Sequence, residues 1–218
     1  MKLFIYGANG AAIEIYDLAY RINMTNNKYS EIILIDDFQD EIEYYGTKRI
    51  RFSSCKKVAG EEEMEFIIAV GEPSFRKLLA DRIVDNGYKL TTLIDESAIV
   101  SETATIAPGC IINAGAIVSS KVCLDENCMV MYQAIIGHDA HVKSNCVICP
   151  KATVGGNSIV GERCFLGISS SMKQGVNLGN DVIIGMGSMV FRDVEAKNTV
   201  VGNPARITKG NSEHKVFI

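Results

Sequence analysis

The sequence predicts a small α/β domain of parallel strands and helices, followed by a parallel β-helix. Residues up to about 92 alternate short apolar runs with segments of helical spacing. From Ile94 to Val190 an aliphatic residue recurs at every sixth position. The composition is that of a folded globular protein, with 47% hydrophobic and 22% charged residues in a chain of 218.

The first segment is expected to form a parallel sheet covered by helices. Residues 2–6 are an apolar, β-rich run that ends at the turn Gly7-Ala8-Asn9-Gly10, and helical spacing continues from there to Ile22. Further strands are expected at 31–35 and 65–70, and a helix is expected at 74–85, stopping at Asn86-Gly87. Continuous apolar strands that alternate with helices are typical of parallel sheets.

The carboxyl ends of these strands predict a binding edge, since ligands of such sheets bind there. Gly7 to Gly10, Asp36-Asp37 and Gly71 would converge at this edge. The first turn lacks the third glycine of a dinucleotide fingerprint, so a carbohydrate or nucleotide is favoured over a full dinucleotide. Asp36 suits a contact with a ribose or base hydroxyl, although an aspartate at a strand end is often only a turn residue.

The hexapeptide period predicts the second fold. Seventeen consecutive sixth positions are aliphatic, and the residue four further on is small. A helix needs a period of about 3.6 and a strand a period of about 2, so neither explains the pattern. Three short strands per coil do explain it, with the aliphatic residue pointing inward and the small residue at the corner. Residues eighteen apart should therefore stack.

Stacking brings four of the seven cysteines into one column: Cys110, Cys128, Cys146 and Cys164. Neighbours in this column would be about 4.8 Å apart. A thiolate metal site is one interpretation, but these positions fall in the small-residue slot, which favours simple packing. The other three, Cys123 among them, show no ligand spacing.

A histidine followed by an aspartate is the strongest candidate for chemistry. His138 lies two residues past an inward aliphatic residue, where a side chain should leave the coil, and Asp139 can orient and polarise it as a general base. Gly156 lies one coil further on, beside His138, and leaves room and a backbone N–H for a thioester arm. A surface histidine without a role is the alternative.

The other two histidines carry weaker signals. His141 is expected to be a surface or packing residue, and His214 lies in a polar tail. A metal pair of His138 and His141 is disfavoured because a catalytic zinc needs three protein ligands. We therefore expect no metal.

Several classes of protein are disfavoured. The net charge of −4 provides no basic face for nucleic acid. No apolar run approaches the roughly 20 residues of a membrane span, and residues 1–6 lack the pattern of a signal peptide. An odd number of cysteines favours reduced thiols and a cytoplasmic location.

Over nearly its whole length the chain resembles the NeuD/PglD-type sugar acyltransferases, which are hexapeptide-repeat enzymes. The resemblance rests on a short half-Rossmann domain joined to a β-helix, on the mid-helix His138-Asp139 and on the closing run Val201-Gly202-Asn203-Pro204-Ala205-Arg206. It implies a left-handed β-helix. We expect a sugar- or nucleotide-binding domain at 1–92, an acyltransferase domain at 93–208 and a tail at 209–218.

The resemblance implies roles for particular residues. His138 would deprotonate the acceptor amine or hydroxyl, Asp139 would raise its basicity, and the Gly156 N–H is a candidate donor to the oxyanion. The positions that match the wall of the CoA channel are Ile168, Met186 and Gly187, with residues 203–206 near its far end. The positions that match sugar-nucleotide contacts are Asn9, Gly10, Ala11, Asp36, Asp37 and Gly71.

Three positions depart from the family pattern. Val147 stands where a second histidine commonly contacts the acetyl group, Met131 where an asparagine is common, and Ala11 where a histidine is frequent. Val147 is expected to border the acyl group, and an apolar residue there leaves a longer acyl chain open.

The resulting hypothesis is a cytoplasmic homotrimer that transfers an acyl group, normally from acetyl-CoA, to an amino or hydroxyl group of a sugar or nucleotide sugar. The process would be surface glycan or polysaccharide biosynthesis, without a nucleic-acid partner or membrane insertion. The alternative is a non-catalytic sugar-nucleotide-binding subunit that regulates or scaffolds a glycan enzyme, with Val147 and Met131 marking a decayed site. An NAD-dependent oxidoreductase is a distant third.

Overall fold

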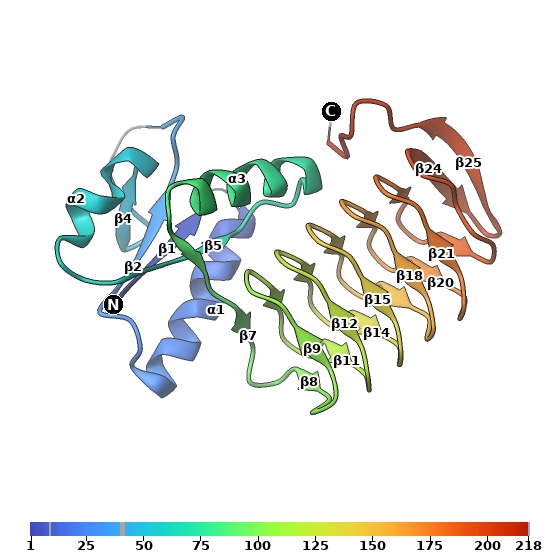
Figure 1. Ribbon diagram of the computed structural model, residues 1–218, viewed down its shortest axis with the longest axis horizontal. Coiled ribbons are helices and arrows are strands. Elements are labelled where there is room, and N and C mark those ends of the chain that lie inside the picture. Colours follow the sequence, from blue (N-terminus) through green and yellow to red (C-terminus); the bar gives the residue numbers. More distant parts are fainter. Residues whose placement is uncertain (9, 40–41, 218) are drawn as a thin grey trace.

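The computed structural model describes residues 1–8, 10–39 and 42–217 and has two parts joined side by side (Figure 1). The N-terminal part is a six-stranded sheet in the order β3-β4-β2-β1-β5-β6. Its strands are β1 (Lys2–Tyr6), β2 (Glu31–Ile35), β3 (Ile42–Tyr44), β4 (Thr47–Ile50), β5 (Met64–Ile68) and β6 (Lys89–Leu90). All described pairs are parallel except β3 with β4.

Helices cover both faces of this sheet. The apolar residues of α1 (Gly10–Asn26) pack on one face, where Ile15, Leu18 and Ala19 are fully buried. The other face is covered by η1 (Phe52–Ser54), α2 (Cys55–Ala59) and α3 (Pro73–Asp85). The expected strands and helices are present. Most of their ends differ by no more than two residues, as element ends commonly do, whereas α1 continues four residues past Ile22, to Asn26. The hairpin of β3 and β4 was not expected.

The remainder is a three-faced solenoid of two-residue strands, each paired in parallel with the strand eighteen residues away. The first face holds β7 (Leu93–Ile94), β10 (Ile111–Ile112), β13 (Met129–Val130), β16 (Val147–Ile148), β19 (Phe165–Leu166) and β22 (Ile183–Ile184), extended by β24 (Asn198–Gly202) and β25 (Ala205–Gly210). The second face holds β8 (Ile99–Val100), β11 (Ile117–Val118), β14 (Ile135–Ile136), β17 (Thr153–Val154), β20 (Ser171–Met172) and β23 (Met189–Val190). The third face holds β9 (Thr105–Ile106), β12 (Cys123–Leu124), β15 (His141–Val142), β18 (Ile159–Val160) and β21 (Asn177–Leu178). The predicted combination of an α/β domain and a left-handed parallel β-helix is confirmed.

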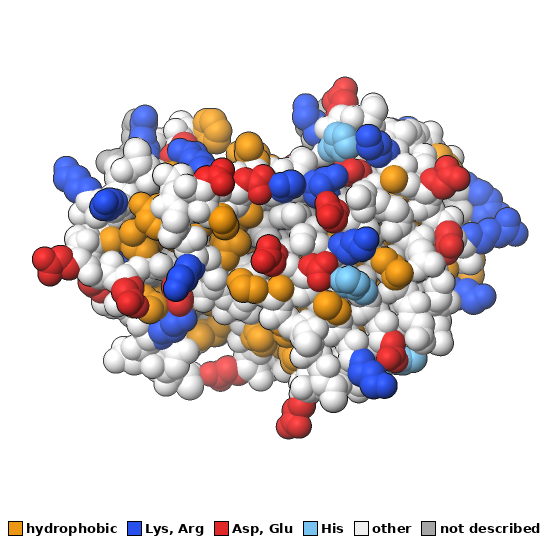
Figure 2. Space-filling model, in the orientation of Figure 1, with side chains coloured by type: hydrophobic (Ala, Val, Ile, Leu, Met, Phe, Trp, Pro, Cys, Tyr) orange, Lys and Arg blue, Asp and Glu red, His pale blue; other side chains and the backbone are white. Residues whose placement is uncertain are grey.

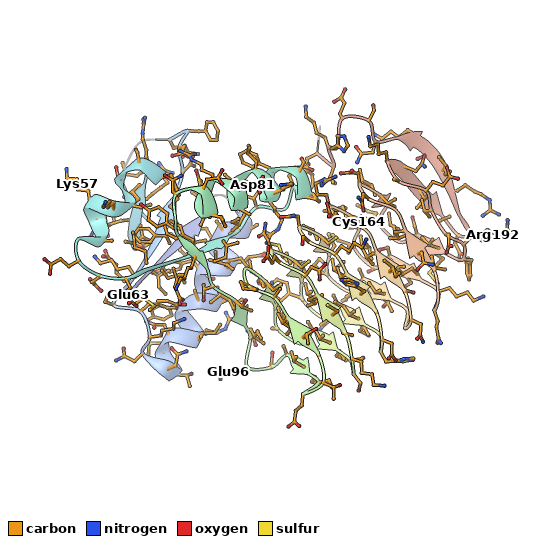
Figure 3. The ribbon with its side chains drawn as sticks, viewed as in Figure 1. Lys57, Glu63, Asp81, Glu96, Cys164 and Arg192 are labelled. Atoms are coloured by element: carbon orange, nitrogen blue, oxygen red, sulfur yellow. The ribbon has the colours of Figure 1, made fainter. Side chains whose placement is uncertain are left out.

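The hexapeptide pattern explains the interior of the solenoid. Inward aliphatic residues such as Ile136 and Val142 are fully buried and form one continuous core with the small corner residues. In Figure 3, the labelled Cys164 lies among the coils, whereas Arg192 projects at the far end of the β-helix. The residue before each corner often has a positive φ, as Asp139 does at 57°.

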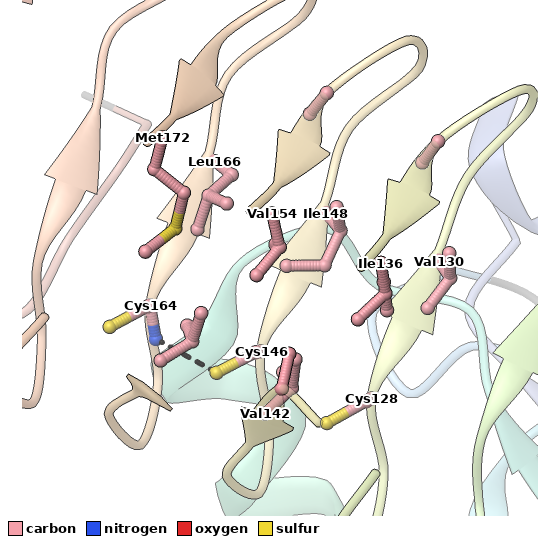
Figure 4. Packing of buried hydrophobic residues seen from close by; sticks show 14 of the residues in the cluster. Cys128, Val130, Ile136, Val142, Cys146, Ile148, Val154, Cys164, Leu166 and Met172 are labelled. Carbon is pink, nitrogen blue, oxygen red and sulfur yellow. Dashed lines mark hydrogen bonds between the residues drawn. The ribbon is translucent and has the colours of Figure 1, made fainter. Parts of the chain in front are cut away.

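The cysteine column is part of this core. Each thiol donates a hydrogen bond to a backbone carbonyl fifteen residues on, as Cys146 Sγ does to Gly161 O at 2.9 Å. Figure 4 shows Cys128, Cys146 and Cys164 in line beside the inward aliphatic residues. All four are buried. The packing interpretation therefore explains this column, since the thiols are used as small donors within the coils.

The two parts share an interface with an apolar and a polar component. Buried outward residues of the first face, such as Ile111 and Met129, belong to the same apolar cluster as the residues of α1. The polar component includes Arg76 of α3, which is fully buried, and an ion pair of Arg21 with Asp95 at 2.7 Å. The Arg76 guanidinium donates to Asn127 O in the solenoid at 2.9 and 3.0 Å and to Ile68 O in the sheet at 2.7 Å. Burial lowers the pKa of Arg76 to about 10.

We expect Arg76→Met to destabilise the fold strongly. The substitution keeps most of the apolar volume but removes the donors that satisfy buried carbonyls on both sides of the interface. Breaking a buried charged network of this kind costs about 3–5 kcal/mol, which urea unfolding at a fixed protomer concentration would measure. Lys77→Met, on the same helix but half-exposed, is the matched control and should change stability by less than about 0.5 kcal/mol. An unchanged midpoint for Arg76→Met would contradict the assignment.

The C-terminal segment returns to the N-terminal domain. After β25, the backbone N–H groups of Val216 and Phe217 donate to Glu72 Oε2 at 2.9 and 3.1 Å. The ring of Phe217 packs edge-on against Phe165, with centroids 5.6 Å apart. Residues 211–217 thus bridge the end of the β-helix and the start of α3 (Figure 1).

Candidate active site

The turn between β14 and β15 presents His138 outside the coil. The preceding Ile136 is buried, so the chain leaves the core at Gly137 and re-enters it at Ala140. His138 Nδ1 lies 2.9 Å from Asp139 Oδ2, and both side chains are about half exposed. Because an ionised carboxylate only accepts, Nδ1 carries the proton and Nε2 keeps its lone pair. A neutral imidazole in this tautomer is a competent general base.

Gly156 lies directly against this imidazole. A Cβ built on Gly156 would lie 2.8 Å from His138 Nε2 and 3.0 Å from the two adjacent ring carbons. Only a glycine lets the ring occupy this position. The Gly156 carbonyl accepts from Gly175 N at 2.9 Å, whereas its own N–H has no acceptor in the described part of the chain. A free N–H beside a general base is the arrangement that can stabilise an oxyanion.

The residues expected to line the CoA channel lie on a different edge. Ile168 and Met186 follow β19 and β22, so they project from the turns between the first and second faces, where both are exposed. Gly187 lies in the same turn as Met186 and has a positive φ of 65°. His138 and Gly156 occupy the opposite edge, between the second and third faces. One copy of the chain therefore does not bring the two groups together.

Val147 is placed differently again. It faces outward from β16 on the first face, is 2% exposed, and belongs to the apolar cluster between the two domains. Its side chain is therefore not accessible to a cofactor, and Val147 is not part of the proposed site.

A cavity of about 710 Å³ lies at the carboxyl edge of the N-terminal sheet. Its lining residues are Tyr6, Gly7, Ala8, Ile35, Asp36, Asp37, Phe38, Val70, Phe75, Leu78, Leu79, Asp81, Arg82, Asp85 and Asn86. The ends of β1, β2 and β5 meet here, as the strand order requires. The wall formed by α3 combines apolar side chains with charged ones, Arg82 among them, and the end of β2 adds Asp36 and Asp37.

A polar triad organises this cavity. Arg82 Nη1 donates to Asp37 Oδ2 at 2.6 Å and to Tyr6 Oη at 2.5 Å, and Tyr6 Oη donates to the same carboxylate oxygen. The guanidinium also lies 4.5 Å from the centre of the Phe52 ring. Burial favours the neutral acid, but the hydrogen bonds from Tyr6, the Phe52 N–H and Arg82 outweigh it and lower the pKa of Asp37.

Only some of the residues that the sequence predicted for this site line the cavity. Asp36 lines the cavity and its Oδ1 accepts from Phe38 N at 2.9 Å, so it also orders its own loop. Gly10 and Ala11 begin α1, directly after the lining residues of the first turn. Gly71 lies beside the Phe217 ring instead. Asn9 lies outside the described residues.

Sequence reasoning missed Tyr6 and Arg82. In the sequence Tyr6 is simply the last residue of the first strand, and Arg82 lies inside a helix with no motif around it. Arg82 stands in the last turn of α3, on the side toward the strand ends. The sequence alone does not predict this position, because it depends on how α3 packs on the sheet.

Figure 2 shows acidic and basic side chains interspersed over most of the face that it presents, with basic ones gathered at the far end of the β-helix. Among the described residues, none of the helices has both the length and the apolar character that crossing a membrane requires.

Comparisons with known proteins agree with both halves of the fold. Residues 2–83 match the PglD N-terminal domain, and residues 157–192 match the hexapeptide repeat of succinyl-transferase. The acetyltransferase domain of PglB from Neisseria gonorrhoeae FA1090 is 27% identical, with a TM-score of 0.88 over 95% of this chain and 99% of that one. The same domain has been solved in complex with acetyl coenzyme A.

Two more distant structures share the fold. Perosamine N-acetyltransferase from Caulobacter crescentus, solved as a histidine-to-asparagine mutant with CoA and GDP-perosamine, is 23% identical, with a TM-score of 0.85 over 96% of this chain and 97% of that one. WeeI from Acinetobacter baumannii AYE is 20% identical, with a TM-score of 0.87 over 95% and 100%. The expected resemblance to the NeuD/PglD-type sugar acyltransferases is confirmed by the two family matches and by the structural match to the PglB domain.

Proposed function

We propose that this acyltransferase moves the acetyl group of acetyl-CoA to an amino or hydroxyl group of a nucleotide sugar, with His138 as the general base. The observation that carries the proposal is the geometry at Gly156: an imidazole whose Nδ1 is held by Asp139 presents Nε2 beside an unpaired backbone N–H. The complex of the PglB domain with acetyl coenzyme A supports the donor.

The reaction follows from this arrangement. His138 Nε2 takes the proton of the acceptor N–H or O–H as that atom attacks the thioester carbonyl carbon. The Gly156 N–H donates to the oxyanion that forms. Collapse breaks the C–S bond, and the CoA sulfur leaves as a thiolate that takes up a proton. No acyl-enzyme is required.

The cavity at the carboxyl edge of the N-terminal sheet is the proposed binding site of the acceptor's nucleotide. Phe75 and Leu78 offer apolar surface for a base, and Arg82 and Asp37 offer charged hydrogen-bonding groups. The start of α1 places a helix N-terminus next to Gly7 and Ala8, which favours phosphate. The complex of perosamine N-acetyltransferase with GDP-perosamine supports this class of acceptor.

We infer a homotrimer for the active enzyme. His138 and the expected CoA wall, Ile168 and Met186, project from opposite edges of the second face, so a neighbouring copy has to supply one of them. Exposed apolar side chains on that face, such as Ile99 and Ile135, are consistent with its burial against a neighbour. The proposed setting is cytoplasmic biosynthesis of surface glycans.

The test is CoA release from acetyl-CoA with a panel of 4-amino nucleotide sugars, free sialic acid and simple hexoses, followed by the mass of the product. We expect turnover with a nucleotide sugar and a product heavier by one acetyl group. Arg82→Gln should raise the KM for that acceptor at least about tenfold while leaving the KM for acetyl-CoA unchanged. Tight binding of nucleotide sugars without turnover of any acceptor would instead favour the non-catalytic scaffold.

A further inference from the structure

Three side chains with metal-binding atoms meet on the third face of the β-helix: Cys123, Asp125 and His141. Their sulfur, oxygen and nitrogen atoms all lie within 4.8 Å of one another, and no other group of this kind occurs among the described residues. His141 Nε2 lies 2.9 Å from Asp125 Oδ1, and Cys123 Sγ lies 3.6 Å from the same oxygen. The reaction proposed above uses none of these atoms.

The solenoid holds these residues in fixed positions. Cys123 and His141 are register partners on the neighbouring strands β12 and β15 (Figure 1). Both side chains point outward because the residues that follow them, Leu124 and Val142, are buried in the core. Asp125 is anchored through its own backbone, with its N–H donating to Val142 O at 2.9 Å and its carbonyl accepting from Cys110 Sγ at 3.2 Å.

The spacing of the three atoms suits a tetrahedral ion. Bonds of about 2.3 Å to sulfur and about 2.0–2.2 Å to nitrogen and oxygen place ligand atoms roughly 3.3–3.6 Å apart. The separation of Cys123 Sγ and Asp125 Oδ1 already has this value, and Asp125 and His141 need to separate by a few tenths of an ångström. Small side-chain rotations provide that, because both side chains are partly exposed.

The exposure of Cys123 distinguishes it from the other cysteines. All six others are buried, whereas Cys123 is half-buried on the surface. On the third face, Cys123 also pairs with Thr105, and His141 also pairs with Ile159. Neither of these neighbours carries a thiol, imidazole or carboxylate. Three protein ligands with an open fourth position for water, drawn from thiolate, imidazole and carboxylate, suit Zn²⁺.

We propose that Cys123, Asp125 and His141 bind one divalent ion of the Zn²⁺ type per chain. On binding, the Cys123 thiol releases its proton to solvent as the sulfur–metal bond forms. The imidazole proton that Nε2 shares with Asp125 moves through solvent to Nδ1, which frees the Nε2 lone pair for the ion. The site joins two adjacent coils next to the His138 turn.

The experiment titrates Co²⁺ and then Zn²⁺ into the chelator-treated full-length protein. Co²⁺ should bind at one equivalent per chain and give the near-ultraviolet charge-transfer absorption of a cobalt–thiolate bond, which Zn²⁺ then displaces. Cys123→Ser should abolish that absorption. His141→Ala and Asp125→Asn should each weaken binding at least about tenfold. Replacing a residue that only hydrogen-bonds to a metal ligand already lowers metal affinity about 10–100-fold.

Two matched variants test the assignment. Cys149→Ser changes a buried cysteine of the same β-helix and should keep the absorption, as should His138→Ala, which changes a histidine three residues away. Absence of stoichiometric binding to the unaltered protein would overturn the site. Charge-transfer absorption that persists in Cys123→Ser, or unchanged affinity in Asp125→Asn, would overturn it equally. None of these readouts depends on acetyl transfer.

Discussion

His138→Ala is expected to lower the rate of acetyl transfer about 10²–10⁴-fold, the usual contribution of a positioned general base. The imidazole stands on a turn outside the coil, and its loss removes no core contact, so the β-helix should assemble normally. Affinity for acetyl-CoA should remain close to that of the unaltered protein. Steady-state kinetics with the preferred acceptor and calorimetric titration with acetyl-CoA would measure the two effects separately.

His214→Ala provides the histidine control. His214 lies in the C-terminal segment, 3.0 Å from Asp181, and has no part in the proposed reaction. Its loss should leave the turnover rate near that of the unaltered enzyme. Full activity in His138→Ala would remove His138 as the base, whereas equal losses in both variants would indicate a structural effect.

Gly156→Ala is expected to cost about 10²-fold in kcat, because the new methyl group would occupy the position of the His138 ring. Displacing a catalytic group by about 1 Å commonly has this effect. The fold should survive, since the contact is with the end of a side chain that can rotate away. Thermal unfolding and kinetics on the same preparation would show the loss of activity without a loss of stability.

The adjacent glycine provides the contrast. A Cβ on Gly155 would lie 2.4 Å from the backbone nitrogen of Gln174, so Gly155→Ala should destabilise the coil itself. Gly210→Ala, whose Cβ meets only Lys197 O at 3.7 Å, should change neither property. If Gly156→Ala kept full kcat, the imidazole would not need its present place against Gly156.

The solenoid was predictable because one rule governs it. A fixed period makes contacts between residues far apart in the sequence a matter of counting, and for this reason the sequence alone pairs His138 with Gly156. The same counting brings Cys123 beside His141, eighteen residues on, although these residues show no ligand spacing along the chain, which is the usual signal of a metal site. Ile168 lies thirty residues after His138, which is one full coil and two thirds of the next. Counting therefore places Ile168 on a different edge of the β-helix.

The N-terminal domain was predictable only in outline. Its β3–β4 hairpin turns at Tyr45-Gly46, where both residues have positive φ, and Tyr-Gly lacks the asparagine or aspartate that usually signals such a turn. The Tyr6–Asp37–Arg82 triad joins two strands and a helix from distant parts of the chain. No local sequence pattern predicts these contacts, because they depend on how α3 packs across the sheet.

The hairpin of β24 and β25 has a consequence for the length of the molecule. A repeat that pairs with itself every eighteen residues offers at each end a row of unpaired backbone groups, open to further copies. At the C-terminal end, β24 pairs with β22 in parallel and β25 then runs antiparallel to β24, which breaks the repeat. Cutting the chain before this hairpin would expose β22 as an unpaired edge strand, and such edges favour pairing with another chain. The closing hairpin therefore ends the eighteen-residue repeat on the first face, where it covers the edge of β22.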